Sequence, residues 1–394
     1  MFDWRRLWCR DVAFVLVVCL VSGLLVVLPD FYASPYAQIE ERVVGEVLEV
    51  DNALLQQYGI VKAGSQRLKV RILEGHHAGQ EVVASNDLIG KMESDKMFRA
   101  GDRTFLVLTT LGEQVMAAAA YDHYRLTIEL LLVALFAALL VAFTGWGGVR
   151  AMLSFAFAIL LLWKVLLPGI LRGHDPIWVA LGIATLIAGV TLFLVAGVGK
   201  TALVAWLGAM LGILLTAAMA LLLFPSFRLH GAILPFSETL LYSGFEHLDL
   251  GRLFVAAIFL GASGAVIDVA IDVSAAMAEV AAKRPDLSAR ELTRSGFFVG
   301  RAMVSTMVTT LLMAYVSSSM ALLMVLLSRG VPPIQILNLN FISAELLKTV
   351  VGSLGLVTVA PFTAVVGGVL YARRVHGSDL AGVVVAPGAD PDRG

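Results

Sequence analysis

Cysteine is nearly absent from this sequence, which contains only Cys9 and Cys19. Cys9 precedes the first apolar run and Cys19 lies inside it, so the two offer neither a disulfide framework nor a metal-binding pattern. Charged residues are also scarce, at 15% of the chain, whereas 59% of the residues are hydrophobic and the mean hydropathy is +0.86. So few charges cannot cover the surface of a soluble protein of 394 residues. The composition therefore predicts an α-helical membrane protein with several spans.

Motifs of known catalytic sites are absent as well. The sequence has no complete phosphate-binding glycine loop, no histidine–glutamate zinc pair and no G-x-S-x-G elbow. The stretch 197–201 resembles a fragment of a phosphate loop but lacks its first glycine, and we interpret it as a turn between spans. A net charge of −1 gives no indication of a nucleic-acid partner. We therefore expect a protein that is not an enzyme, uses no cofactor and binds no nucleic acid.

Eight apolar runs each approach the ~20 residues that a helix needs to cross a bilayer. The first, with the basic segment before it, predicts a span within residues 1–30 or a secretory signal that is removed. The other seven predict a bundle over residues 126–374, followed by a disordered tail over 375–394. These seven runs cover residues 126–144, 151–171, 176–196, 201–224, 252–280, 301–328 and 346–371.

Lysine and arginine residues gather at one end of these runs. When the N-terminus is placed inside, Arg150, Lys283 and Arg373 are among the many basic residues that fall on the inner side. Cytoplasmic loops carry an excess of such residues. The sequence therefore predicts that both termini are cytoplasmic and that the segment between the first two spans is extracytoplasmic.

That segment, residues 38–125, has the composition of a water-soluble β domain. Apolar and polar residues alternate in 42–50 and again in 66–73, and turn residues separate about five short strands. This pattern predicts a small barrel, with an OB-like fold as the specific expectation. His76 and His77 fall in a turn, where adjacent histidines more often contact solvent than bind a metal.

The run 252–280 contains the acidic residues on which the functional hypothesis depends. Asp268 and Asp272 are four residues apart and share one face of a helix. A charge near the bilayer centre costs from about 2.5 to more than 10 kcal/mol, so this face should meet the bundle interior, a partner or water. Gly261 and Gly264 lie on the same side, where another helix could pack closely.

Other charged residues of the spans are expected near the membrane surfaces. Glu279 should reach the inner interface, where Lys283, four residues later, can pair with it. Glu345 and Lys348 lie near the outer end of the last run and are expected to anchor it at the interface.

Two local signals predict where helices begin, end or are interrupted. Ser288 and Glu291 form a capping box, which predicts a short helix that ends near Gly296. Pro361 removes one backbone N–H and should kink or break the last span. A broken helix beside a carboxylate is how many transporters expose backbone carbonyls to an ion.

The run 301–328 is rich in hydroxyl groups, and Thr306 and Thr310 are spaced to share a face. Such hydroxyls either bond to carbonyls of their own helix or line a polar path that faces the carboxylates. Whether a metal ion binds there stays open. The candidate polar site consists of Asp268, Asp272, Thr306, Thr309, Thr310, Tyr315 and Pro361.

Three segments, residues 261–270, 285–300 and 306–315, resemble the YibE/F family of bacterial multi-pass membrane proteins. The resemblance implies an extracytoplasmic domain followed by a multi-span bundle in the inner (plasma) membrane, without implying a settled activity. Asp268 matches the common aspartate of the family pattern. Asp272, Ala302 and Thr309 depart from it, standing where a serine, an acidic residue and an asparagine are usual.

These observations lead to two main hypotheses. In the first, the protein is a transporter or ion-permeation protein for a small ion or solute, with a carboxylate site on the 252–280 helix. In the second, it is a non-transporting accessory protein that anchors the β domain and binds a partner membrane protein or a second copy of itself. A third, an enzyme acting on lipid-linked substrates, would require several polar catalytic groups at an interface, which the sequence does not display.

Overall fold

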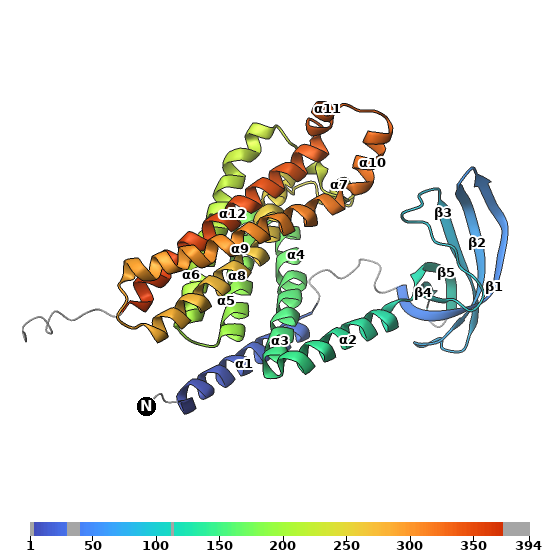
Figure 1. The fold of residues 1–394 in the computed structure, drawn as a ribbon. Coiled ribbons are helices and arrows are strands. Elements are labelled where there is room, and N and C mark those ends of the chain that lie inside the picture. Colours follow the sequence, from blue (N-terminus) through green and yellow to red (C-terminus); the bar gives the residue numbers. More distant parts are fainter. Residues whose placement is uncertain (1–3, 30–39, 112–113, 373–394) are drawn as a thin grey trace, which may run out of the picture. The chain divides into compact units, whose positions relative to one another are not determined.

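A computed structural model of the chain describes residues 4–29, 40–111 and 114–372, so the tail expected at 375–394 lies outside the described residues. The chain divides into two compact units, of which one is Asp30–Gly148 and the other combines Met1–Pro29 with Val149–Gly394. Within the described residues, eight helices are long and apolar enough to cross a membrane. The expected combination of helices with a separate set of strands is confirmed (Figure 1).

The unit Asp30–Gly148 contains a closed barrel whose strands follow the order β1-β2-β3-β5-β4. Leu68, Val70 and Ile72 of β2 point inward and are buried, because alternate side chains of a strand lie on opposite faces. The expected five strands are confirmed, while the OB-like assignment stays a prediction. The elements of this unit are β1 (Glu40–Tyr58), β2 (Val61–Ile72), β3 (Glu81–Ile89), β4 (Arg103–Leu111), β5 (Gln114–His123) and the apolar helix α2 (Leu126–Thr144).

The side chain of Gln66 is polar and yet fully buried in the barrel. Its Nε2 donates to Asn52 Oδ1 at 2.8 Å and to the Phe98 carbonyl at 3.1 Å. Its Oε1 accepts from the Phe98 N–H and from Asn86 Nδ2, both at 3.0 Å. Because both amide protons and the carbonyl oxygen are bonded, this amide is stable inside an apolar core.

The expectation that both turn histidines contact solvent is wrong for His77, which is buried. Its Nδ1 lies 2.8 Å from Glu41 Oε2, and the His76 N–H donates to Glu41 Oε1 at 3.0 Å. Partial burial raises the pKa of Glu41, but the hydrogen bonds from His76 and His77 outweigh this effect and leave the pKa lowered. The turn is therefore fixed to β1 rather than free.

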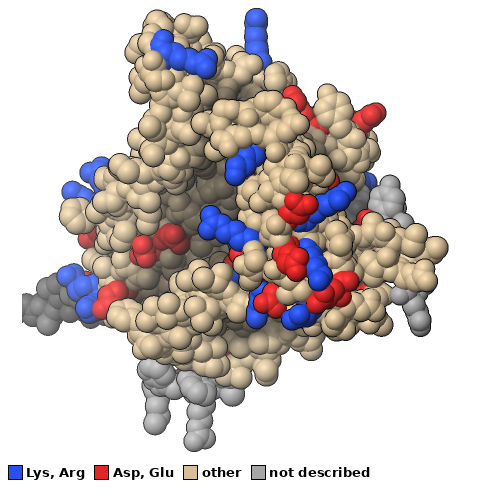
Figure 2. Space-filling view, turned by 90° about the vertical axis from the view of Figure 1, so that its right-hand side faces the viewer, with Lys and Arg blue, Asp and Glu red and all other residues tan. Residues whose placement is uncertain are grey.

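The outer surface of the barrel is charged, as expected for a domain in water. Glu81 on β3 pairs with Lys69 and Arg71 on the neighbouring strand β2. Acidic and basic side chains likewise lie close together on the molecular surface in Figure 2. Such exposed pairs contribute little to stability, so the apolar interior and the Gln66 network hold the barrel together.

The second unit is a helical bundle built around α8, whose neighbours are α5, α6, α9 and α12. Phe254, Phe259 and Met277 of α8 are almost completely buried and form the centre of the core. The long helices are α1 (Trp4–Val27), α3 (Trp146–Leu161), α5 (Pro176–Ala196), α6 (Lys200–Leu223), α8 (Leu250–Lys283), α9 (Ala289–Ser318) and α12 (Asn340–Tyr371). The shorter elements are the π-helical turn η1 (Leu162–Leu166), α4 (Leu167–Leu171), η2 (Phe224–Phe227), η3 (Gly231–Ile233), α7 (Ser237–Tyr242), α10 (Met320–Ser328) and α11 (Pro333–Leu337).

Small residues allow α6 and α12 to pack closely. Gly208 of α6 lies against Thr363 of α12, and Gly355 of α12 lies against Thr216 of α6. A Cβ atom at either glycine would overlap the threonine that faces it. The two helices therefore approach each other as in other membrane helix pairs with glycine at the contact.

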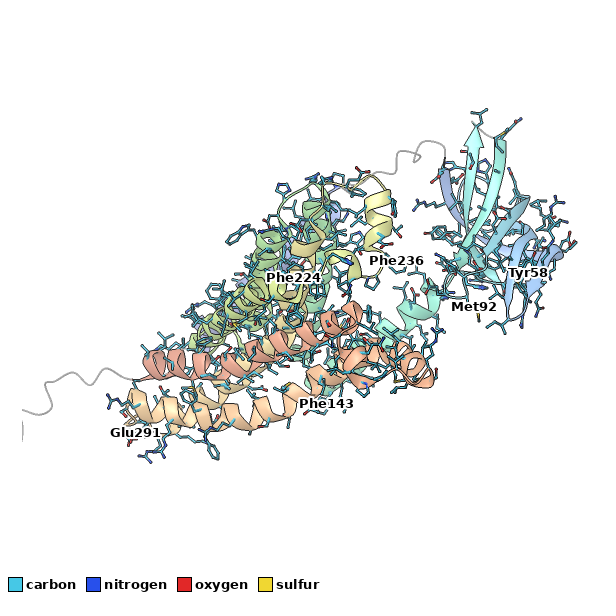
Figure 3. All side chains as sticks on the ribbon, turned by 90° about the horizontal axis from the view of Figure 1, so that it is seen from above. Tyr58, Met92, Phe143, Phe224, Phe236 and Glu291 are labelled. Atoms are coloured by element: carbon cyan, nitrogen blue, oxygen red, sulfur yellow. The ribbon has the colours of Figure 1, made fainter. Side chains whose placement is uncertain are left out.

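The predicted capping box at the start of α9 is confirmed. The Glu291 N–H donates to Ser288 Oγ, and the Ser288 N–H donates to Glu291 Oε2 at 2.8 Å. In Figure 3, Glu291 lies at the end of the bundle where α9 begins. These bonds satisfy two backbone donors that would otherwise lack partners at a helix N-terminus.

The expected end of this helix near Gly296 is wrong, because α9 continues to Ser318 and is followed by the separate α10. Gly296 is buried against Ala364 of α12, where a Cβ would lie only 2.8 Å from the alanine Cβ. Glycine costs about 1 kcal/mol inside a helix. The close packing that Gly296 permits here outweighs that cost, so the helix continues beyond it.

The sequence predicts a kink or a break at Pro361. A break is wrong, because α12 is helical from Asn340 to Tyr371. The proline removes one N–H, so the carbonyl of Val357 lacks its donor within the helix. Val359 and Thr363 on either side of it are fully buried. Packing along both neighbouring turns therefore preserves the helix despite the missing bond.

Candidate functional site

The rest of the described chain leaves one face of α8 uncovered. Gly261, Gly264, Asp268 and Ala275 are exposed and Asp272 is partly exposed, whereas the opposite face forms the core. These five residues recur every three or four positions, which places them on one side of the helix. We refer to them as the α8 face.

Asp268 lies near the middle of α8, the longest of the eight apolar helices. It is about 27 Å from the start of the helix at Leu250, at a rise of about 1.5 Å per residue. Nothing in the described part of the chain forms a hydrogen bond or ion pair with its carboxylate. At the end of the same helix, Glu279 pairs with Lys283 at 2.8 Å, as predicted.

The two glycines of the α8 face differ in their contacts with the described chain, since Gly261 lies near a side chain of α9 and Gly264 lies near none. A Cβ atom at Gly264 would meet nothing within 4 Å, and one at Gly261 would lie 3.1 Å from the hydroxyl of Tyr315. Close helix packing against Gly261 and Gly264 therefore stays a prediction. The close contacts that the sequence suggested here occur instead at Gly208 and Gly355.

The hydroxyl-rich helix α9 runs antiparallel to α8. Gly300 of α9 lies near Val273 of α8, since a Cβ there would be 3.6 Å from the valine Cγ2. Both helices rise by the same distance per residue. The fifth residue before Val273 on α8 and the fifth residue after Gly300 on α9 therefore lie at the same level. Asp268 is therefore level with Ser305.

The threonines of α9 bond within their own helix. Thr306 Oγ1 donates to the Met303 carbonyl at 2.9 Å, and Thr310 Oγ1 donates to the Thr306 carbonyl at 3.3 Å. Thr309 is exposed, like Thr306 and Thr310. Among the described residues, no hydrogen bond links any of these hydroxyls to a carboxylate of the α8 face. The structure thus places them at a similar level without joining them to Asp268 or Asp272.

Tyr315, Glu345 and Lys348 meet where α9 ends and α12 begins. Glu345 and Lys348 of α12 pair with each other, and their side chains are only 14% and 18% exposed. The Lys348 Nζ lies 5.8 Å from the centre of the Tyr315 ring. The expectation that Glu345 and Lys348 anchor the last run at the membrane interface stays a prediction, and the structure adds that the fold covers most of both side chains. An acid and a base three residues apart in an apolar run were the sequence signal for this buried pair.

Two atoms of this cluster are buried without a hydrogen-bond partner among the described residues, namely the Tyr315 hydroxyl and Glu345 Oε2. Buried polar atoms in native proteins nearly always have partners, contributed by protein or by water. The Tyr315 hydroxyl can therefore donate or accept one more hydrogen bond, and Glu345 Oε2 can accept one.

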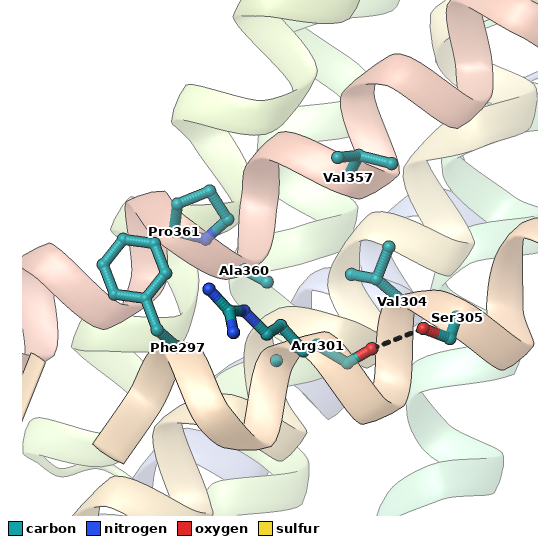
Figure 4. A pocket seen from close by; sticks show the side chains of 8 residues that line it. Phe297, Arg301, Val304, Ser305, Val357, Ala360 and Pro361 are labelled. Atoms are coloured by element: carbon teal, nitrogen blue, oxygen red, sulfur yellow. Dashed lines mark hydrogen bonds between the residues drawn. The ribbon is translucent and has the colours of Figure 1, made fainter. Parts of the chain in front are cut away.

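Pro361 lines a groove between α9 and α12 with a volume of about 480 Å³ (Figure 4). Arg301 is the charged residue of its lining, and Val357, whose carbonyl loses its usual helical donor to Pro361, is another lining residue. In the sequence Arg301 is one more basic residue at the start of its apolar run, with no signal that it would line a groove. The lining consists of Phe297, Gly300, Arg301, Val304, Ser305, Val357, Ala360 and Pro361.

The candidate residues lie on α8, α9 and α12, and all three helices fall within the match to a known family. The model of the YibE/F-like protein family matches residues 132–373, more than half of the chain. The chain belongs to the YibE/F-like family. The resemblance inferred from the sequence is thus confirmed, and the barrel of this YibE/F-like protein precedes the matched range. No curated protein and no solved structure shows significant similarity to the chain.

Proposed function

We propose that this YibE/F-like protein is a transporter or ion-permeation protein of the bacterial plasma membrane, with Asp268 at the centre of its polar site. The observation that carries this proposal is the exposed position of Asp268 halfway along an apolar helix of 34 residues. Lipid cannot surround an ionised carboxylate at that depth without a large cost. Water or polar groups must therefore reach the α8 face, and a polar path to mid-helix is what permeation requires.

The remaining candidate groups suit the same role. Asp272 lies one turn further along the α8 face and can bind the ion that Asp268 releases. Thr306 and Thr310 donate to carbonyls, so their oxygen lone pairs remain available as hard ligands. Val357 lines the groove, and its carbonyl, which lacks the donor that Pro361 removes, is proposed as a further oxygen ligand for a solute there.

The proposed orientation follows from the placement of basic residues. Both termini are assigned to the cytoplasm and the barrel to the outside, with the lipid bilayer around the eight apolar helices. In this orientation the capping box at Ser288 and the Glu279–Lys283 pair lie at the inner surface. A small ion or solute then passes between the two sides along the α8 face.

We expect Asp268→Asn to abolish ion flux while leaving the protein folded. The substitution keeps nearly the same volume, and no described partner of Asp268 loses an ion pair or hydrogen bond. Proton, sodium and potassium uptake into vesicles containing the purified protein should fall to the leak rate of protein-free vesicles. The midpoint of thermal unfolding in detergent should match that of the wild type.

Asp286→Asn provides the matched control, because Asp286 pairs with Arg284 outside the α8 face. It should retain wild-type flux. The proposal is contradicted if Asp268→Asn conducts like the wild type, or if its only effect is a loss of folding.

A second function is favoured by the open space beside Gly264, where a helix from another molecule would fit. In that function the protein does not transport but anchors the barrel and binds a second copy or a partner membrane protein. We expect Ala275→Cys, in a chain with Cys9 and Cys19 replaced by serine, to form a stoichiometric crosslink in native membranes. A partner that is lost on deletion of residues 40–120, together with the absence of flux, would establish this function over transport.

A further inference from the structure

We propose that Tyr315, Glu345 and Lys348 form an outer proton-exchange site on the same route as Asp268, so that the ion moved is the proton. This inference rests on the proposed transport function and names its ion. None of the three residues belongs to the α8 face. They are connected to it by the position of the Tyr315 hydroxyl.

Glu345 has the free acceptor that such a site needs. Its Oε1 is bonded by the Lys348 ammonium, and its Oε2 is buried with no partner among the residues that the structure describes. A buried carboxylate with one bonded and one free oxygen can gain a proton without loss of an existing bond. The ammonium beside it balances the charge of the carboxylate when that proton leaves.

Tyr315 extends this cluster to the α8 face. Its ring lies beside the Lys348 ammonium, and its hydroxyl is buried and unbonded within the described chain. The same hydroxyl lies 3.1 Å from where a Cβ of Gly261 would be. Glycine at position 261 thus leaves room for the phenol at the outer end of the α8 face.

Space continues from that point to Asp268. Gly261 precedes Asp268 by about 10 Å along one side of the helix, at about 1.5 Å per residue. Between them Gly264 is exposed and a Cβ there would meet nothing within 4 Å, so no described side chain blocks this side of the helix, and the proposal places a chain of water molecules along it. Asp272 and Glu279 follow on the same side toward the inner end of α8.

The chemistry of these groups favours a proton over a metal cation. A metal cation needs several oxygen ligands, whereas at Glu345 only Oε2 is free because Oε1 accepts from the Lys348 ammonium; one oxygen suffices for a proton. No group of three or more His, Cys, Asp or Glu side chains that could hold a metal was found in the described ranges. The segments 253–267 of α8 and 302–318 of α9 contain no charged side chain, so the titratable groups facing Tyr315 are those of α12.

Each transfer moves one proton and leaves every group in its starting state. A hydronium ion on the outer side protonates Glu345 and becomes water. The Glu345 O–H bond then breaks as a water molecule between Glu345 and Tyr315 takes that proton and passes one of its own to the Tyr315 oxygen, because the two side chains are not bonded to each other directly. Tyr315 simultaneously gives its own O–H proton to the chain of water molecules beside Gly261, so it remains a neutral phenol. The last water protonates the Asp268 carboxylate, which later releases the proton toward Asp272 and the inner side.

We expect Tyr315→Phe to lower proton uptake by about a hundredfold, the low end of what positioned proton transfer contributes. The uptake is measured with a pH-sensitive dye in vesicles containing the full-length protein and exposed to an acidic outside. Thermal stability should be unchanged, because the deleted hydroxyl makes no hydrogen bond within the described chain. Glu345→Gln, which cannot carry a proton, should lower the uptake similarly.

Tyr371→Phe is the matched control, since it deletes a hydroxyl that lies 2.9 Å from Ser274 Oγ. It should reduce thermal stability and leave proton uptake unchanged. Wild-type uptake by Tyr315→Phe, when Asp268→Asn is inactive, would overturn the outer site alone. Sodium or potassium flux without proton flux would overturn the choice of ion, and absence of all three fluxes would overturn the proposed function as well.

Discussion

Gly355→Leu is expected to disrupt the contact between α6 and α12 and to destabilise the helical bundle by about 3 kcal/mol, the upper end for an overpacked core. A side chain at position 355 would overlap Thr216, which is almost fully buried and donates to the Gly212 carbonyl. Neither helix can move away freely, because both also pack against α8. The midpoint of thermal unfolding in detergent, followed by tryptophan fluorescence, measures the effect.

Gly182→Leu makes the same change at an exposed position of α5, where a Cβ would meet nothing within 4 Å. It should unfold at the wild-type temperature. Equal stabilities for the two variants would mean that the α6–α12 contact is not tight in the folded protein. A preserved fold in Gly355→Leu with lowered ion flux would instead indicate that this contact moves during transport.

Gln66→Leu is expected to loosen the barrel strongly. Leucine fits the volume but cannot bond to the N–H and C=O of Phe98, and each buried group left unpaired costs about 1–3 kcal/mol. Asn86 would also lose one of the two bonds of its Nδ2 and keep the one to the Lys96 carbonyl. Hydrogen–deuterium exchange of the amides in β1 to β5 should accelerate.

Gln114→Leu is the control, because Gln114 begins β5 with its side chain exposed. Its exchange rates should stay close to those of the wild type. Unchanged protection of the strands in Gln66→Leu would show that the buried amide network does not support the barrel. Exchange in α5 to α12 serves as an internal reference, because those helices belong to the other compact unit.

The location of the acids on α8 could be predicted because it depends only on spacing along one helix. Asp268 and Asp272 share a face in any α-helix. Their exposure depends on which helices cover the remaining faces, and the sequence does not contain that information locally. Burial of the α8 core by α5, α6, α9 and α12 is what leaves the α8 face open.

Gly296 and Pro361 are residues whose local preference was overruled by packing. Both disfavour a helix interior, by about 1 and 3 kcal/mol, and sequence reasoning placed helix irregularities at each. In the fold, Gly296 allows α9 to approach Ala364, and the turns beside Pro361 are buried. The combined packing of long helices exceeds either local penalty.

The sequence by itself determined the number of apolar helices and strands, the extent of the β segment and the carboxylates on one helix. These follow from hydropathy, alternation and helical spacing, which are properties of neighbouring residues. Only the tertiary structure decided that His77 is buried, that the Glu345–Lys348 pair is largely covered, that Tyr315 reaches Gly261 and that Asp268 remains exposed. Burial and contact depend on which distant segments pack together, and that choice is made by the whole chain rather than by any stretch of it.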